Sequence, residues 1–258
     1  MTPALKNLSG LLIDLDGTVY VGDEPVAGAV EVIDFLRSRN IPFRLTTNTT
    51  TRSLSSLHGK LVSMGLPVEP HEIFSVIRAA VAYLRSKGKP SCYLLLTEDP
   101  RGDFADFPQS DEQPECVVVG DIGKYWDYEL VNRVFRMVLQ GADLVALHKG
   151  RYWQTESGLQ VDIGAFVAGL EYVTGKEAVV IGKPSRSFFQ LALEDLNLPA
   201  GQVAMVGDDI ASDVGGAQQA GMHGILVRSG KYREELVAHS PVKPELTIDS
   251  IGDLVGLL

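Results

Sequence analysis

Two aspartates, Asp14 and Asp16, stand two residues apart directly after the apolar run Leu11–Ile13. In an open α/β sheet, ligands bind beyond the carboxyl ends of the strands, so a strand that ends here would deliver both carboxylates to a binding site. One carboxylate can then attack phosphorus while the other transfers protons. The motif Asp14–Thr18 is also compatible with a plain turn, because Asp and Gly are common in turns.

A second acidic group follows the apolar run 203–206. Asp208 and Asp209 come two and three residues after it, and Asp213 lies five residues beyond Asp208. Mg²⁺ prefers hard oxygen ligands and usually keeps several waters, so a few carboxylates from separate strands suffice to hold it. We therefore expect Asp208 to complete a magnesium site with Asp14. For Asp209 the preferred interpretation is local, because an aspartate here can cap the helix that follows.

Cationic and neutral hydrogen-bond donors stand at two further strand ends. Lys183 lies between a glycine and a proline after an apolar run, where its charge can neutralise a phosphoryl oxygen or the nucleophile. Thr47 and Asn48 follow the run 43–46 and offer donors that suit phosphate oxygens, although both residue types also end strands for local reasons. Each motif is weak alone, but together they predict one site.

The elements that position these residues alternate in type. Short apolar runs indicate strands, and apolar residues repeated at i, i+3 and i+4 indicate helices. Such alternation predicts an α/β fold with a mostly parallel, Rossmann-like sheet. The expected core strands cover 11–13, 43–46, 203–206 and 225–227, and the expected helices include 32–36, 54–61 and one that begins near Asp213.

The middle of the chain has helices and strands of its own. A stretch of this length and content is a domain and not a loop. We expect a discontinuous catalytic core at 1–77 and 180–258 and an inserted α/β cap domain at 78–179. Within the insertion, strands are expected at 93–96, 116–119 and 144–147, helices at 79–85 and 130–139, and a surface connection at 103–115.

Composition limits the partners and the compartment. The formal net charge of −10 argues against nucleic acid and anionic membranes, which require a cationic footprint. It allows a small phosphorylated molecule, because a metal and local amides can reverse the field inside a pocket. We see neither a signal-type N-terminus nor an apolar run of about 20 residues, and we expect a cytoplasmic protein. Cys92 and Cys116 are expected to be small buried hydrophobes.

The four ordered motifs resemble those of the haloacid dehalogenase superfamily, and the resemblance covers nearly the whole chain. It implies that Asp14 is the nucleophile and a metal ligand, and that Asp16 is the general acid/base and binds magnesium through its carbonyl. The remaining roles implied are phosphoryl binding by Thr47 and Lys183, metal ligation by Asp208, and support by Asp213. From their positions in the same motifs we also expect Asn48 to bind the substrate and Asp209 to have a supporting role.

The family resemblance also bears on the reaction and on the insertion. A dehalogenase lacks the second aspartate, so Asp16 favours phosphoryl transfer. The insertion resembles the large C2-type cap. A narrower likeness to two related subgroups of the family, only one of them named as a phosphatase, leaves the substrate open among phosphate esters, pyrophosphate and phosphoramidates. The expected function is therefore that of a magnesium-dependent phosphatase with an aspartyl-phosphate intermediate on Asp14. A phosphotransferase or phosphomutase, and a non-catalytic phospho-ligand binding protein, are the alternatives.

Within the insertion, Asp162 is the residue expected to recognise the leaving group. His148, Lys149 and Arg151 are further candidates, with a solvated strand end as the preferred interpretation of His148 and Lys149. Four aromatic residues are expected either in the core of the cap or in a subunit contact that would make a homodimer through the cap: Trp126, Tyr128, Tyr152 and Trp153.

Overall fold

The structure is a computed structural model that describes residues 7–155 and 158–258. The chain divides into two compact units. The first, here the core unit, contains the chain up to Thr47 together with Ser55–Ser75 and Lys183–Leu258. The second, the inserted unit, contains Asn48–Leu54 and Val76–Gly182. Residues 48–54, 76–77 and 180–182, which we assigned to the core from the sequence, are thus grouped with the inserted unit.

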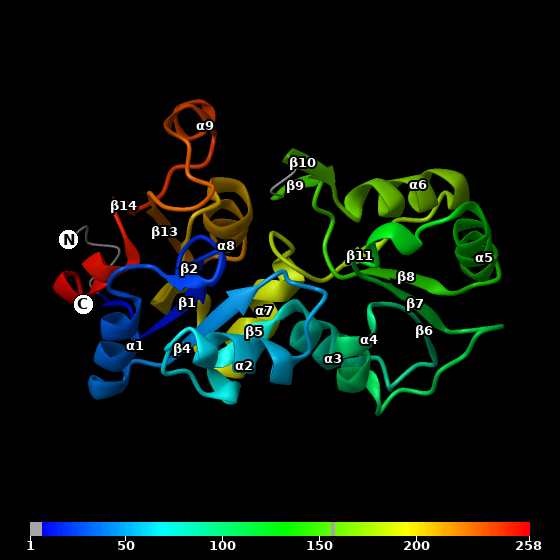
Figure 1. Ribbon diagram of the computed structural model, residues 1–258, viewed down its shortest axis with the longest axis horizontal. Helices are drawn as coiled ribbons and strands as arrows, with labels where there is room; N and C mark the ends of the chain where they lie inside the picture. Colours follow the sequence, from blue (N-terminus) through cyan, green and yellow to red (C-terminus); the bar gives the residue numbers. More distant parts are fainter. Residues whose placement is uncertain (1–6, 156–157) are drawn as a thin grey trace. The chain divides into compact units, whose positions relative to one another are not determined.

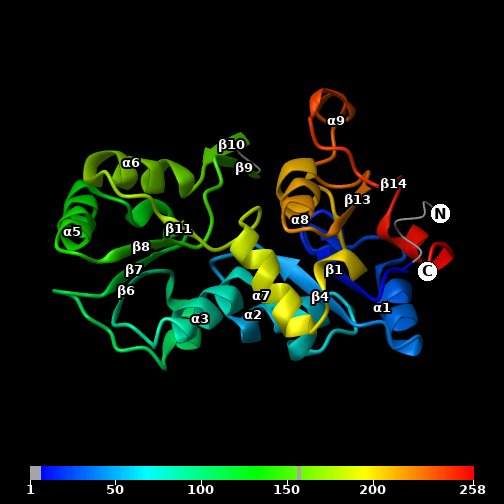
Figure 2. The ribbon, with the colours of Figure 1, turned by 180° about the vertical axis from the view of Figure 1, so that it is seen from behind.

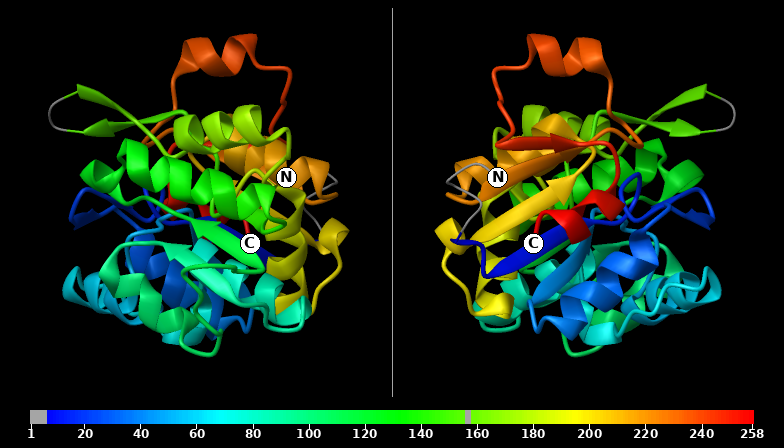
Figure 3. Two further views of the ribbon diagram at one scale, coloured as in Figure 1. Left: turned by 90° about the vertical axis from the view of Figure 1, so that its right-hand side faces the viewer. Right: turned by 90° about the vertical axis from the view of Figure 1, so that its left-hand side faces the viewer.

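The core unit is built on a six-stranded parallel sheet with the order β14-β13-β12-β1-β4-β5. Every residue of β1 and β12 is buried, as expected for parallel strands covered on both faces. Both side views of Figure 3 include the sheet, and in the right-hand view its strands run side by side. The strand bounds are β1 (Gly10–Asp14), β4 (Phe43–Thr47), β5 (Ile73–Ser75), β12 (Val203–Gly207), β13 (His223–Val227) and β14 (Leu246–Ile248).

Helices cover the core sheet, and α7 crosses its face when the molecule is seen from behind (Figure 2). Phe188 of α7 packs edge-on against Phe74 of β5, with ring centroids 5.4 Å apart. A short hairpin joins β2 (Tyr20–Val21) to β3 (Glu24–Pro25). The helices are α1 (Ala29–Ser38), α2 (Leu54–Ser63), α7 (Arg186–Leu196), α8 (Gly216–Gln219) and α9 (Glu234–His239), with short 3₁₀ turns η2 (Pro70–Glu72), η5 (Ala200–Gln202) and η7 (Ile251–Gly256).

One helix start differs from the sequence expectation. The helix expected near Asp213 begins at Ile210 with a π-helical turn, η6 (Ile210–Gly215), which continues into α8. Asp209 caps this turn, because its side chain accepts hydrogen bonds from the backbone N–H groups of Ala211 and Ser212, both at 3.0 Å. The capping interpretation of Asp209 is confirmed.

The inserted unit contains a second parallel sheet, with the order β11-β8-β7-β6, and an antiparallel hairpin, β9-β10. Its sheet packs against an apolar cluster that includes Val134 and Val167. Figure 1 labels its helices and strands, which are α3 (Val76–Ser86), β6 (Cys92–Leu95), α4 (Glu98–Arg101), β7 (Cys116–Val119), α5 (Tyr128–Leu139), β8 (Asp143–Ala146), β9 (Tyr152–Thr155), β10 (Gly158–Val161), α6 (Gly164–Thr174) and β11 (Val179–Val180). Two short 3₁₀ turns, η3 (Gly102–Phe104) and η4 (Gly123–Tyr125), complete the unit.

Several side chains of the inserted unit test sequence expectations. Cys92 and Cys116 are free and buried, which confirms that they are core residues. The connection expected at the surface over 103–115 is anchored, since Phe104 and Phe107 are buried. Trp126 stacks on Phe166, with ring centroids 4.2 Å apart.

Two of the aromatic residues expected in a core or a subunit contact are exposed instead of being in the core: Tyr128 and Tyr152. The side chain of Trp153 lies outside what the structure describes. No helix in the described part of the chain has the length and apolar character that a membrane crossing requires.

Candidate active site

Lys183 is the centre of a buried cluster in the core unit. Its Nζ donates to Oδ1 of Asp14, to Oδ1 of Asp213 at 2.8 Å and to Oγ1 of Thr46 at 3.5 Å. Asp14 is the last residue of β1, and Thr46 lies in the neighbouring strand β4. Two sequence motifs far apart in the chain are thereby brought into direct contact, and the sequence-predicted partners Asp14 and Lys183 lie together.

Asp213 holds this arrangement from a second side. Its Oδ1 accepts from Lys183, and its Oδ2 accepts from the backbone N–H of Asp209 at 3.1 Å. It is only 2% exposed, and it faces β12, where a Cβ added to Gly207 would lie 2.2 Å from Oδ2. Asp213 thus links the lysine to the turn after β12.

Asp208 follows β12 and is also only 2% exposed. Its Oδ2 accepts from the backbone N–H of Lys231 at 2.6 Å. Its Oδ1 is buried and has no hydrogen-bond partner among the described residues. Buried carboxylate oxygens are normally paired, so this oxygen has an unmet need for a hydrogen-bond donor or a cation.

Three carboxylates are close enough to hold one cation. One oxygen each of Asp14, Asp208 and Asp213 lie within 4.8 Å of one another. Hard oxygen donors in a buried position suit a divalent cation such as magnesium, and the unpartnered Oδ1 of Asp208 gives that cation a ligand. The residues therefore fit a metal site. Asp213 is the third member by distance, although both of its oxygens already accept hydrogen bonds.

The protonation of the cluster follows from burial and crowding of charge. Burial raises the pKa of Asp14 well above its usual range; Lys183 opposes this shift, whereas Asp213 and Asp208 add to it. Burial, reinforced by Asp213, raises the pKa of Asp208 to about 6. Burial lowers the pKa of Lys183, but Asp14 and Asp213 outweigh it, so its pKa lies above the usual value and the ammonium stays charged.

Asp16 and Thr47 form the more open side of the site. Asp16 is exposed, and its Oδ2 accepts a hydrogen bond from Thr47 Oγ1 at 3.3 Å. Thr47 ends β4 and is buried. An exposed carboxylate beside a buried nucleophile candidate can exchange protons with a substrate or a water, so the two aspartates of the first motif differ in environment.

The remaining two predicted residues belong to the inserted unit. Asn48 follows Thr47 in the chain, and a Cβ added to Gly182 would meet its Oδ1 at 2.6 Å. Asp162 is half-buried, and its Oδ1 accepts from the N–H of Ile163 at 2.7 Å. Its Oδ2 lies 3.8 Å from Nδ1 of His148.

His148 and Lys149 differ from each other in environment. His148 is buried, so the solvated interpretation is wrong for this residue. Lys149 is exposed, and its Nζ donates to Glu171 at 2.5 Å. Only the lysine therefore fits the solvated strand end that we expected for both.

Sequence reasoning missed one segment of the site. Residues 229–231 follow β13, and the backbone of Lys231 contacts Asp208. Its side chain lies 3.6 Å from Oδ2 of Asp209. The sequence did contain one indication that this segment belongs to the site: Arg228-Ser229-Gly230-Lys231 follows a predicted apolar strand, as the recognised motifs do. Thr46 belongs to the strand expected at 43–46, but its contact with Lys183 was not predicted.

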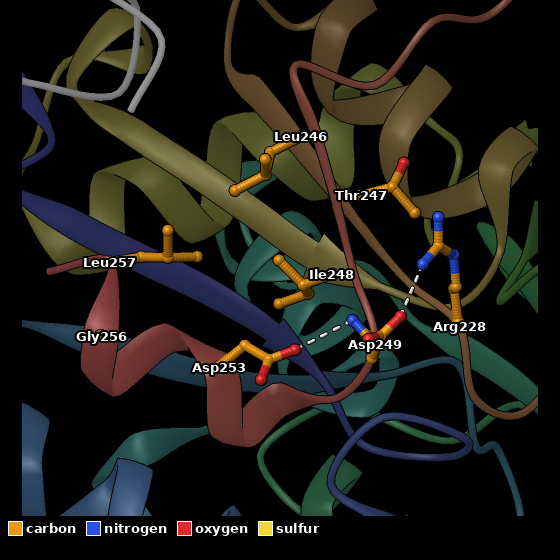
Figure 4. Close-up of a pocket in the computed structure, with 8 residues that line it drawn as sticks. All are labelled: Arg228, Leu246, Thr247, Ile248, Asp249, Asp253, Gly256 and Leu257. Carbon is orange, nitrogen blue, oxygen red and sulfur yellow. Dashed lines mark hydrogen bonds and ion pairs between the residues drawn. The ribbon is translucent and has the colours of Figure 1, made fainter.

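A pocket of about 440 Å³ lies elsewhere, at the edge strand β14 (Figure 4). Arg228 and Asp249 line it and pair with each other at 2.6 Å, and the N–H of Asp249 donates to Asp253 at 2.9 Å. None of the residues that the sequence motifs single out lines this pocket.

The parallel sheet and the buried carboxylate–lysine cluster at its strand ends define a class of phosphoryl-transferring hydrolases. Two family models match the chain: haloacid dehalogenase-like hydrolase at residues 11–107 and HAD-hydrolase-like at residues 180–254. The phospholysine phosphohistidine inorganic pyrophosphate phosphatase of Rattus norvegicus is 37% identical over 98% of this chain and 95% of its own length.

Two further proteins are similar over almost their full lengths. The haloacid dehalogenase-like hydrolase domain-containing protein 2 of Homo sapiens is 38% identical over 98% of this chain and 96% of its own length. The crystal structure of 4-nitrophenylphosphatase from Thermotoga maritima superposes with a TM-score of 0.91 at 26% identity, covering 98% of both chains. The chain belongs to the haloacid dehalogenase-like hydrolase family, among its phosphatases.

Proposed function

We propose that this phosphatase is magnesium-dependent and that it hydrolyses a small phosphorylated molecule through an aspartyl phosphate on Asp14. The observation that carries the proposal is the contact of Asp14 with Lys183 beside the unpartnered oxygen of Asp208. One buried cluster therefore contains a nucleophile, an ammonium group that can bind the phosphoryl group, and a carboxylate oxygen that can bind a metal.

Asp14, Asp208 and the backbone carbonyl of Asp16 are the proposed magnesium ligands. The first two supply carboxylate oxygens in the buried cluster, and the carbonyl is assigned from the family motif. When bound, magnesium would neutralise charge on the phosphoryl oxygens and on Asp14. Asp213 is assigned to hold Lys183, because it accepts hydrogen bonds through both oxygens.

The first half-reaction transfers the phosphoryl group to the enzyme. An oxygen of Asp14 attacks phosphorus, and the bond from phosphorus to the leaving oxygen breaks. Asp16 donates a proton to that leaving oxygen. Lys183 and Thr47 stabilise charge on the transferred group, and Asn48 is assigned the same task from its position after Thr47.

The second half-reaction returns the enzyme to its starting state. Asp16 accepts a proton from a water molecule, the water oxygen bonds to phosphorus, and the bond from phosphorus to Asp14 breaks to release inorganic phosphate. The exposure of Asp16 supports this double role, because the same carboxyl must exchange protons in both directions. We assign the inserted unit to leaving-group selection, with Asp162 as the first residue to test.

The proposal is tested with an aryl phosphate and purified protein. Phenol and inorganic phosphate should appear in equal amounts, chelation by EDTA should abolish both, and added Mg²⁺ should restore both. An excess of phenol over phosphate in the presence of alcohols would instead indicate a phosphotransferase. Release that is unaffected by EDTA would contradict the magnesium assignment, and the absence of any release across phosphate esters, pyrophosphate and phosphoramidates would contradict turnover.

The covalent intermediate needs its own measurement. Acid quenching during turnover should trap a phosphoenzyme, and peptide mass spectrometry should locate the phosphate on Asp14. Phosphate on another residue, or release from a protein that never becomes phosphorylated, would contradict the assignment of Asp14 as the nucleophile. Asp14→Asn should form no phosphoenzyme. Asp34→Asn is its matched control and should be phosphorylated like wild type, because Asp34 is an exposed aspartate on α1.

A further inference from the structure

Residues Ser229–Lys231, here the β13 loop, contact the first motif and Asp208 at the same time. Ser229 Oγ donates to the carbonyl oxygen of Gly17 at 2.6 Å. The N–H of Lys231 donates to Oδ2 of Asp208 at 2.6 Å. The loop thus ties the turn after β1 to the carboxylate after β12, and each of the two contacts joins a backbone atom to a side-chain atom.

Two glycines bring these segments close together. A Cβ added to Gly230 would lie 2.0 Å from Oδ2 of Asp208 and 2.6 Å from the Cα of Gly17. A Cβ added to Gly17 would also lie 2.0 Å from the same oxygen. Carbon and oxygen atoms cannot approach this closely without a bond, so a side chain at either position would displace the Asp208 carboxylate.

We propose that the β13 loop is a fifth element of the active site, which positions Asp208 for metal binding by fixing Oδ2 and leaving Oδ1 for the cation. The proposal rests on the proposed role of Asp208 as a metal ligand. Gly230, Ser229 and the backbone of Lys231 are positioning residues, because they act through Asp208 and Gly17 and do not touch the reacting atoms.

The division of labour between the two oxygens of Asp208 explains the contacts. Oδ2 has the Lys231 amide as its partner, whereas the buried Oδ1 has none among the described residues. Hydrogen bonds to the non-ligating atoms of a metal ligand hold it in one orientation, and their loss typically weakens metal binding by about 10–100-fold. The loop therefore reduces the number of orientations that Asp208 must give up when the cation binds.

Gly230→Ala is the decisive variant, and Gly22→Ala is its matched control. Both glycines have positive φ angles, +55° and +64°, so both substitutions carry the same kind of backbone strain. An added Cβ meets Asp208 at Gly230 but meets nothing within 4 Å at Gly22. The difference between the two variants therefore separates the crowding of Asp208 and of the adjoining Gly17 backbone from the loss of glycine.

The readout is the dissociation constant for MgCl₂, measured by calorimetry on the full-length protein without substrate. We expect Gly230→Ala to weaken binding by about 10–100-fold relative to wild type, and Gly22→Ala to match wild type. Asp208→Asn serves as the reference for a lost ligand. Equal affinities of Gly230→Ala and Gly22→Ala, with weak binding only in Asp208→Asn, would overturn the positioning role alone. Equal affinities of wild type and Asp208→Asn would overturn the metal assignment itself.

Ser229 gives a second test that does not depend on the glycine backbone. Ser229→Ala removes the hydroxyl bonded to Gly17, and we expect about a threefold to tenfold weaker Mg²⁺ affinity, as for one lost hydrogen bond. Ser229→Thr keeps a hydroxyl and should restore the affinity. A melting temperature of the metal-free variants close to wild type would separate positioning from global stability. Wild-type affinity in Ser229→Ala would contradict the role of this residue.

Discussion

The core unit and the inserted unit are each built on a parallel sheet with largely buried strands. The two sheets differ in the residues that stand at the carboxyl ends of those strands. In the core unit, β1 ends at Asp14 and β12 leads into Asp208. In the inserted unit, β7 leads into Gly120 and β8 into Leu147, both buried. Parallel sheets place loops at their carboxyl ends in both cases, so the residues at those ends and not the fold determine where chemistry is possible.

Buried charge makes the same distinction. Among the described residues, the buried carboxylates and ammonium groups all belong to the core unit: Asp14, Glu72, Lys183, Asp208 and Asp213. Burying a charge is costly unless it is paired, and Glu72 is paired with Arg37 at 2.6 Å. The other four share one ammonium group among three carboxylates. This imbalance is tolerated only where a further cation or a proton compensates it.

The largest effect should come from the nucleophile. Asp14→Asn preserves the size of the side chain but removes its charge, so turnover should fall by about 10⁴-fold or more and no phosphoenzyme should form. Asp16→Asn should instead impair protonation and hydrolysis, and with a good leaving group the phosphoenzyme should accumulate. Acid-quenched labelling and phosphate release measure the two outcomes. Wild-type phosphate release from Asp14→Asn would show that Asp14 of the core unit is not the nucleophile.

The next largest effect should come from the central ammonium group. Lys183→Ala should lower the rate for every substrate by about 10²–10³-fold, because it removes a charge that acts on the phosphoryl group common to all. Comparison of kcat/KM for three or four phosphate esters tests this uniformity. Lys87→Ala, at an exposed lysine after α3, is the control. A change in the ranking of substrates, with little change in rate, would mean that Lys183 acts on the leaving group.

Magnesium affinity should depend on pH through Asp208. Its pKa is raised from 3.8 to about 6. Between these two pH values the carboxyl group therefore keeps its proton in the metal-free folded protein, whereas in the unfolded chain it has lost the proton. The stability contribution of this group is therefore present below pH 4 and is lost as the pH rises toward 6.

Mg²⁺ must displace the proton of the Asp208 carboxyl group when it binds. The apparent dissociation constant for Mg²⁺ should therefore rise by up to about tenfold for each pH unit below 6. The melting temperature should increase more on adding Mg²⁺ at pH 7.5 than at pH 5. Asp208→Asn, which cannot titrate, should show a smaller change between the two pH values. A Mg²⁺ effect that is equal in wild-type protein at both pH values would contradict this linkage.

The smallest effect on a small aryl phosphate should come from the inserted unit. Asp162→Ala should leave that rate within a few-fold of wild type but change the ratio of kcat/KM between larger esters by about tenfold, because leaving-group contacts set such ratios. The comparison with Lys183→Ala uses the same esters. Equal loss for every ester in Asp162→Ala would show that Asp162 is not a specificity residue and that the two units do not divide catalysis and substrate selection at this position.

Much of this organisation was predictable from local sequence. The strands that lead to Asp14 and Asp208 are apolar runs followed by polar residues, and the strand that ends at Thr47 follows Pro42. The parallel core sheet is confirmed by the structure. The short strand β14 was missed, since three residues carry no clear periodicity. The strand expected before Lys183 is β11, but it pairs with β8 in the sheet of the inserted unit and not in the core sheet. Such strands are defined by their neighbours in the sheet.

Other parts of the site depend on contacts that no local pattern encodes. Asp213 was expected only as a supporting acid, and its bond to Lys183 joins residues from different motifs. The helix expected near Asp213 begins earlier because Asp209 caps the turn. The contact of Lys231 with Asp208 uses a backbone amide, so the identity of residue 231 gives no sign of it.

The position of β1 in its sheet has a consequence for the order of folding. Leu11 of β1 pairs with Ala204 of β12, whereas the inserted unit pairs β6, β7 and β8 in chain order. Long-range strand pairing is slow, since the chain entropy of closing the intervening loop is lost before the contact stabilises it. We therefore expect the inserted unit to acquire its sheet early and the central strand of the core to acquire its second neighbour late. Asp14 and Asp208 meet only at that late step, so the competence of the site reports that folding is complete.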